Sequence, residues 1–241
     1  RGWVPGPVDA PVGDAPPVLA LGAQFDTTVA VTQGDAVLPS QHVGDVDGPA
    51  TAEFLRDAVE HLTGLLGVDP AVVACDMHPG FVTTEIAGEL ADEGLAGPVE
   101  VQHHHAHAAG LLAEHGRERA VVVAADGTGY GTDGTVWGGE VLDARLDEFD
   151  RVGGLSTFRL PGGEAAVERP GRILASLLAD REDVVERVVA ADGADDRAAA
   201  EAVVRQARRG VNAPETTSAG RLLDAVSALL GVCERRGYEG E

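Results

Sequence analysis

Apolar and polar positions alternate near the start of the chain in the way that β-strands require. Residues 18–31 alternate around a glycine, residues 33–35 (QGD) form a turn signal, and residues 36–43 can return as another strand. The other elements of the first half follow from changes in the apolar spacing. They are a helix over 50–66, a buried strand over 71–76, a helix over 81–94, a strand over 98–102 and a helix over 103–116 that Gly116 ends.

The second half of the chain repeats this order of strands followed by helices. It opens with a strongly apolar strand that leads into a glycine-rich turn, and its later part is Ala-rich, acidic and helical in spacing. The expected elements are strands over 120–126, 135–144 and 155–161, a mostly helical segment over 164–209 and an amphipathic helix over 220–232.

Two β-rich segments that each add helices predict an α/β fold of two related lobes with a cleft between them. Residues 1–17 are rich in Pro and Gly and are interpreted as a linker from a preceding domain. We expect the first lobe over 18–118 and a partial second lobe over 119–241. Thr217 or Ser218 would cap the last helix.

Charge and composition exclude several classes of function. All 18 basic residues are arginines, so a P-loop lysine, a Schiff-base lysine and a lysine general base are ruled out. The net charge of −22 argues against binding to nucleic acid or to an anionic membrane surface, because both are negative. No apolar run of membrane-spanning length and no signal peptide occurs, so we expect a cytoplasmic protein. Cys75 and Cys233 lack zinc-ribbon spacing; we expect two separate buried thiols, with a single disulfide as the alternative.

The most informative motif is QHHHAH, residues 102–107. On a helix, His103 and His107 lie one turn apart and share a face, as two ligands of one metal ion must. Imidazole suits Zn or Fe. No Glu lies between them, which excludes the metalloprotease HExxH motif, and His104 and His105 would point elsewhere. The alternative is an exposed helix start that is rich in histidine.

Residues 124–140 combine an acidic strand end with a glycine-rich segment. Gly129, Gly131 and Gly134 form a GxGxxG pattern, but a strand follows them where a dinucleotide-binding motif needs a helix. A hairpin whose glycine backbone approaches a phosphate fits better. Asp126 ends the apolar strand and could be a metal ligand, an acid beside the phosphate or only a cap of the turn.

Two further motifs could contact a nucleotide. Gly162 and Gly163 precede a helix whose N-terminus could hold an anion, although such a pair is more often a turn. Gly220 and Asp224 lie one turn apart at a helix start, where close backbone approach and a carboxylate suit a ribose diol. The alternative for this second pair is ordinary helix packing with an exposed Asp.

Taken together, the motifs resemble the C-terminal region of HypF, the carbamoyltransferase family of nickel–iron hydrogenase maturation. The resemblance covers nearly the whole chain, and its HHHAH and hairpin motifs are quite specific. The matching segments, in chain order, are RGWVPGPV (1–8), LPSQHVGDVDG (38–48), DMHPGFVTTEIA (76–87), VQHHHAHAAGLLAEHG (101–116), DGTGYGTDGTVWGGE (126–140), LPGGEAAVERPGRIL (160–174) and TTSAGRLLDAVSALLG (216–231).

The resemblance implies an actin/Hsp70/sugar-kinase-like fold and a carbamoyltransferase. In the family, carbamoyl-adenylate is made from carbamoyl phosphate and ATP by a neighbouring domain. This domain passes the carbamoyl group to the C-terminal cysteine thiolate of HypE and leaves AMP. A Zn or Fe ion would polarise the carbamoyl carbonyl, and the partner's thiolate would be the nucleophile.

Carried over to this sequence, the resemblance implies one metal-centred catalytic site with a nucleotide beside it. His103, His107 and Asp126 would be the catalytic metal ligands. The turn that contains Gly127, Gly129 and Gly131 would lie near the phosphate, and Gly220 and Asp224 would contact the ribose.

The sequence departs from the family at two places. Phe25 and Asp26 stand where the family usually has Leu-Lys. The chain stops shortly after Tyr238, where the family continues with a glycine-rich nucleotide loop and another Asp ligand. We therefore expect an incomplete second lobe, exposed apolar surface and marginal solubility outside high salt.

Three other functions fit part of the pattern. A tRNA threonylcarbamoyl transferase would share the fold and the metal, but it should present a basic face to tRNA. An O-carbamoyltransferase that acts on a small-molecule hydroxyl would share a similar His-rich motif. A non-catalytic metal- or nucleotide-binding remnant is the alternative from another class.

Overall fold

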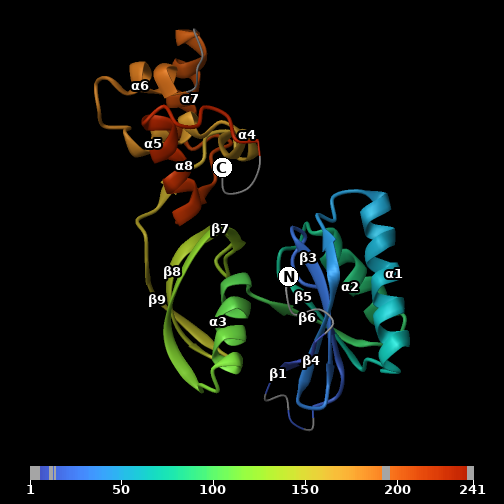
Figure 1. The fold of residues 1–241 in the computed structure, drawn as a ribbon. Helices are drawn as coiled ribbons and strands as arrows, with labels where there is room; N and C mark the ends of the chain where they lie inside the picture. The colour runs from blue at the N-terminus through green and yellow to red at the C-terminus, as the bar shows by residue number, and fades with distance from the viewer. Residues whose placement is uncertain (1–5, 11–12, 14, 192–195, 238–241) are drawn as a thin grey trace. The chain divides into compact units, whose positions relative to one another are not determined.

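The computed structural model describes residues 6–10, 13, 15–191 and 196–237. The chain divides into two compact units, each drawn in Figure 1. Unit 1 comprises Arg1–Ala120 with Asp143–Phe149, and unit 2 comprises Val121–Leu142 with Asp150–Glu241.

Unit 1 is built on a six-stranded mixed sheet with the order β1-β4-β3-β2-β5-β6. Strands β2, β5 and β6 are parallel, whereas β3 and β4 form an antiparallel hairpin beside β2. The strands are β1 (Val8–Asp9), β2 (Val18–Ala20), β3 (Thr27–Gln33), β4 (Ala36–Gly44), β5 (Val72–Asp76) and β6 (Ala96–Val101).

The helices of unit 1 are α1 (Pro49–Leu66), α2 (Val82–Asp92) and α3 (His103–Glu114). Helix α1 begins at Pro49, whose fixed φ suits the first helical position, and it ends at Gly67, which adopts φ of 62°. Its apolar side chains pack with those of α2 and the sheet in one core. The core includes Leu19, Val31, Leu55, Val73 and Ile86.

The parallel strands determine where functional side chains can meet in unit 1. Strands β2, β5 and β6 run in the same direction, so their carboxyl ends lie at one edge of the sheet. Ligands of α/β sheets usually bind at such an edge. The segments that leave it are 21–26 after β2, 77–81 after β5 and 102–103 after β6.

The second sheet has the order β10-β11-β8-β7, and β9 also pairs with β8. Helices follow in the rest of unit 2 and enclose a separate core that includes Ile173, Leu174, Val188, Val204 and Ala225. The strands are β7 (Arg119–Tyr130), β8 (Val136–Arg145), β9 (Phe149–Gly154), β10 (Phe158–Arg159) and β11 (Glu215–Thr216). The helices are α4 (Glu164–Glu168), the 3-10 helix η1 (Pro170–Ile173), α5 (Leu174–Leu177), α6 (Val184–Ala191), α7 (Arg197–Arg209) and α8 (Ala219–Leu229).

The two mixed sheets with their helices confirm the predicted α/β class. The expected helices over 50–66, 81–94, 103–116 and 220–232 are present, and Ser218 caps the last of them. No helix of the described ranges is both long and apolar enough to cross a membrane.

Four details of the predicted elements in the first 44 residues and in the 120–161 region are wrong. Residues 18–31 form two strands, because the chain reverses between β2 and β3. The expected linker contains β1, which pairs with β4 at the sheet edge. The glycine-rich segment after residue 126 is strand, not turn, because β7 continues to Tyr130. The strand expected over 155–161 is only the two-residue β10, and the longer β9 that precedes it was not predicted.

Candidate metal and nucleotide site

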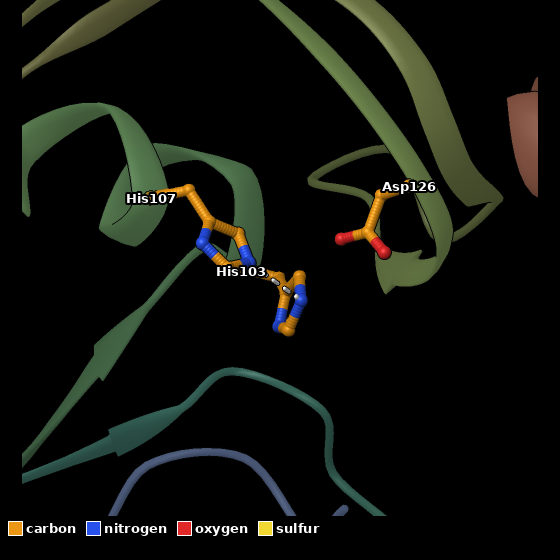
Figure 2. A group of neighbouring side chains, drawn as sticks. All are labelled: His103, His107 and Asp126. Atoms are coloured by element: carbon orange, nitrogen blue, oxygen red, sulfur yellow. Dashed lines mark hydrogen bonds between the residues drawn. The ribbon is translucent and has the colours of Figure 1, made fainter. Parts of the chain in front are cut away.

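Gln102 determines how the histidine-rich helix begins. Its side-chain oxygen accepts a hydrogen bond from the backbone N–H of His105 at 2.9 Å, so Gln102 is the N-cap of α3. The helix therefore starts at His103, directly after β6. This register puts His103 and His107 one turn apart on the same face, and Figure 2 shows both rings projecting from α3.

The His103 and His107 rings are oriented toward each other. Their Nε2 atoms lie 3.3 Å apart and their ring centroids 4.9 Å apart. Two imidazoles on a tetrahedral ion, with metal–nitrogen bonds of about 2.1 Å, place their nitrogens about 3.4 Å apart. The observed separation therefore fits two ligands of one ion without rearrangement of the helix.

Asp76, which was not predicted from the sequence, contacts His103. It ends β5, and its Oδ2 lies 2.9 Å from the Nδ1 of His103. The Asp76 side chain is only 4% exposed, and its Oδ1 accepts the backbone N–H of His78 at 2.8 Å. Its place at the end of a short apolar strand was the signal available in the sequence. Its partner lies 27 residues away and could not be deduced from spacing.

His104 and His105 point away from the His103–His107 face, as predicted, and both are buried in unit 1. The Nδ1 of His104 lies 3.3 Å from the side-chain nitrogen of Gln102. The Nε2 of His105 lies 2.9 Å from the Arg145 carbonyl, and its ring packs against Phe149. These contacts give both residues a packing role.

Asp126 belongs to unit 2, where it lies within β7 rather than at its end. One carboxylate oxygen accepts the backbone N–H of Gly127 at 2.6 Å. Asp126 can offer a carboxylate oxygen to a metal, as His103 and His107 can each offer a ring nitrogen. Figure 2 draws these three side chains with the elements that carry them.

The start of α8 packs directly on the Asp126–Gly127 backbone. The Ser218 hydroxyl donates to the carbonyl of Gly127 at 2.6 Å and accepts the Arg221 backbone N–H at 3.0 Å. A Cβ at Gly220 would lie 2.8 Å from the Gly127 Cα. Gly220 thus lets two backbones approach, a structural role in addition to the predicted ribose contact.

The turn after β7 is centred on Asp133, beyond the predicted Gly127–Gly131 turn. Gly131 N–H donates to the Thr135 carbonyl, and Gly134 N–H donates to the Gly131 carbonyl. Burial alone would raise the pKa of Asp133, but hydrogen bonds from Thr135 and Trp137, with the Arg151 charge, lower it. Gly131 is buried, and a Cβ there would collide with the Trp137 ring. Gly127 and Gly129 lie in β7 itself.

Glu140, in the middle of β8, is a fully buried acid that the sequence reasoning missed. Its Oε2 accepts the backbone N–H groups of Gly138 and Gly139 at 2.6 and 2.7 Å. Its Oε1 contacts Arg151 at 3.0 Å and accepts the Thr217 hydroxyl. This carboxylate therefore joins β8, β9 and the segment before α8, a role that no local pattern indicates.

The remaining predicted residues have protein partners within unit 2. Gly162 N–H donates to the Asn212 carbonyl and Gly163 N–H to the Leu160 carbonyl, before a helix of five residues. Asp224 forms an ion pair with the buried Arg221 at 3.0 Å and lies 3.8 Å from Arg236. Nucleotide contacts by Gly162, Gly163 and Asp224 stay predictions.

Two family models match the chain. Residues 13–114 match the HypF Kae1-like domain, and residues 122–241 match the second subdomain of the carbamoyltransferase Kae1-like domain. Over its whole length the chain is 42% identical to carbamoyltransferase HypF2 of Cupriavidus necator and 35% identical to a probable carbamoyltransferase HypF of Methanocaldococcus jannaschii. It covers 30% and 32% of those proteins, so it spans about a third of their length.

Solved structures agree with these matches. The chain superposes with a TM-score of 0.89 on a full-length HypF in a phosphate- and nucleotide-bound form, at 36% identity. It superposes with a TM-score of 0.88 on T. kodakarensis HypF, at 33% identity. All of this chain is covered in both comparisons, against 31% and 33% of the two solved chains.

Proposed function

Because the chain belongs to the HypF carbamoyltransferase family, we propose that it carries the carbamoyl-transfer site of such an enzyme. The reaction would move a carbamoyl group from carbamoyl-adenylate to the C-terminal cysteine thiolate of HypE in hydrogenase maturation. The observation that carries this proposal is the His103–His107 pair, whose Nε2 atoms lie 3.3 Å apart, in a chain of this family.

We assign one Zn or Fe ion to His103, His107 and Asp126. The separation of the two histidine nitrogens suits a shared ion, and the carboxylate of Asp126 is an accepted ligand type for either metal. The ion would supply positive charge that polarises the carbamoyl carbonyl in a chain whose net charge is −22.

The nucleotide part of the donor is assigned to unit 2. The solved HypF structure described as phosphate- and nucleotide-bound supports nucleotide binding in this family. We propose that the Asp126–Tyr130 end of β7 and the start of α8 border the adenylate, with Gly220 and Asp224 near its ribose. Glu140 would fix the Thr217–Ser218 segment against β8. The proposed nucleotide-binding surface would then be formed before the ligand binds.

The acceptor would be a thiolate from the partner protein HypE. The thiolate attacks the carbamoyl carbon, a C–S bond forms, and the C–O bond to the adenylate phosphate breaks. The bonding electron pair leaves with the phosphate oxygen, so AMP is the second product. The Cys75 thiol of this chain is poorly suited to this role, since it is buried and burial is the main reason that its pKa is raised.

A transfer assay on the whole enzyme tests this proposal. The protein that contains this chain is mixed with carbamoyl phosphate, ATP and HypE, and HypE is followed by mass spectrometry for gain of one carbamoyl group. His103→Ala and His107→Ala should each slow the transfer by about 100-fold or more, because several kcal/mol of charge stabilisation are lost.

His115→Ala is the matched control, because His115 is exposed at the end of the same helix. It should transfer at the rate of the unsubstituted enzyme. Undiminished transfer by both His103→Ala and His107→Ala would refute the assigned site. A carbamoyl group found on a small-molecule hydroxyl, with HypE unmodified, would favour an O-carbamoyltransferase.

A further inference from the structure

Asp76 lies on the side of the His103 ring that faces away from His107. It contacts the Nδ1 side of the ring, while the Nε2 side is directed toward His107. The two nitrogens of an imidazole lie on opposite sides of the ring, so a hydrogen bond at one side fixes the direction of the other.

A carboxylate is an obligatory acceptor, so the contact also determines where the ring proton lies. With Asp76 ionised, the Nδ1 of His103 must carry the hydrogen and donate it to Oδ2 across 2.9 Å. The Nε2 of a neutral ring is then a lone pair, which is the form that binds a metal ion.

The Asp76 carboxylate is itself held rigidly within unit 1. Its second oxygen accepts the His78 N–H, and its backbone carbonyl accepts the hydroxyl of Thr84 at 3.0 Å. The backbone N–H of Asp76 faces the carbonyl of Gly22, which lies just after the neighbouring strand β2. Two parallel strands and α2 therefore determine its position, and its burial removes competing water.

We propose that Asp76 is a positioning residue that fixes the ring direction and the Nε2 lone pair of His103 for metal binding. The inference rests on the metal centre proposed above and adds a residue that does not itself bind the ion. Such carboxylate–histidine contacts behind a metal typically change the affinity for the ion by about 10–100-fold.

The first test measures metal affinity in the full chain. Co²⁺ or Zn²⁺ is titrated in competition with a chelating indicator, for the unsubstituted chain and for Asp76→Asn. The substituted side chain keeps the shape of Asp76 but presents an NH₂ donor toward Nδ1 when it turns that way. The dissociation constant should rise about 10–100-fold.

Glu85→Gln is the control for loss of a negative charge from this segment. It neutralises an exposed carboxylate in the first turn of α2 and leaves the contact between Asp76 and His103 in place. Its dissociation constant should stay within about threefold of the unsubstituted value. An equal loss of affinity in both variants would overturn the inference, because a negative charge nearby would then matter and the contact with His103 would not.

The second test needs no metal. Long-range ¹H–¹⁵N spectra of the histidine rings in the metal-free chain distinguish a protonated Nδ1 from a protonated Nε2. His103 should be protonated at Nδ1 in the unsubstituted chain and should lose this preference in Asp76→Asn. A His103 ring with its proton at Nε2 in the unsubstituted chain would overturn the inference.

The two tests separate failure of the inference from failure of the metal centre. If His103→Ala and His107→Ala lose the ion but Asp76→Asn binds it with unchanged affinity, the role of Asp76 is refuted and the centre stands. If His103→Ala and His107→Ala also bind as the unsubstituted chain does, the centre is refuted and the inference falls with it.

Discussion

Close contact between two glycines determines how the start of α8 lies on β7. A Cβ added to Gly220 would meet backbone atoms at Gly127 and Asp126, at 2.8 and 3.2 Å, and backbone cannot give way as a flexible side chain can. The sequence predicts that another group approaches the backbone closely at Gly220, and a ribose was the expected group. The nearest partner in the structure is the protein's own chain, which a single sequence does not reveal.

Gly220→Ala should therefore lower the free energy of unfolding by about 1–3 kcal/mol, as overpacking does. This loss would outweigh the gain of up to about 1 kcal/mol that alanine brings to a helix. Denaturant titration of the full chain measures the change.

Gly88→Ala is the matched control, since Gly88 lies in α2 and nothing stands within 4 Å of its added Cβ. This substitution should raise the free energy of unfolding by about 0.5–1 kcal/mol. If Gly220→Ala were as stable as the unsubstituted chain, the close contact would not constrain α8.

His103, His107 and Asp76 differ in how far their arrangement can be predicted from the sequence. The spacing of His103 and His107 is local, so the sequence could place both on one helix face, where their rings lie in contact; their binding of a metal ion stays a prediction. The contact between His103 and Asp76 is a tertiary one between the start of α3 and the end of β5. Glu140 shows the same limit, since its partners come from three segments.

At the scale of elements, the local apolar pattern predicts the helices well, but it fails for strands whose extent depends on pairing with another strand. The apolar spacing of α1 and its terminal Pro49 and Gly67 are sufficient to predict it. The segment 127–130 has the composition of a turn, but pairing with β8 extends β7 through it. Strand β9 (FDRVGG) was missed because it lacks alternation and ends in two glycines, yet it pairs with β8.

Charge pairing at the start of α6 gives a prediction about pH. The pKa of Asp183 falls to about 2, mainly through the hydrogen bond from Arg181, with a further contribution from Arg187. An unfolded Asp has a pKa of about 3.9, so the stabilisation is complete above that pH and disappears as the pH falls toward 2.

Asp183→Asn should therefore lower the melting temperature at pH 6, and the difference from the unsubstituted chain should shrink as the pH falls below about 4. The effect should be small and should weaken with added salt, because these side chains are exposed. Asp180→Asn removes the same charge nearby and is the control. A difference that stays constant from pH 6 to pH 3 would contradict the assignment to this cluster.

At the scale of the whole molecule, charge and site chemistry favour the same function. A chain with a net charge of −22 and no lysine repels anionic substrates at long range, so an anionic adenylate needs a local positive centre. Two adjacent histidines and an aspartate are suited to hold such a centre as a metal ion. Because the chain belongs to the HypF family, carbamoyl transfer is the function that we propose for these residues.

The metal content of the purified chain tests the central claim most directly. We expect about one Zn or Fe ion per chain by elemental mass spectrometry after dialysis, as for a site with three protein ligands. His103→Ala, His107→Ala and Asp126→Ala should each lose most of the ion, and His115→Ala should keep it. An unchanged metal content in all three ligand variants would contradict the account.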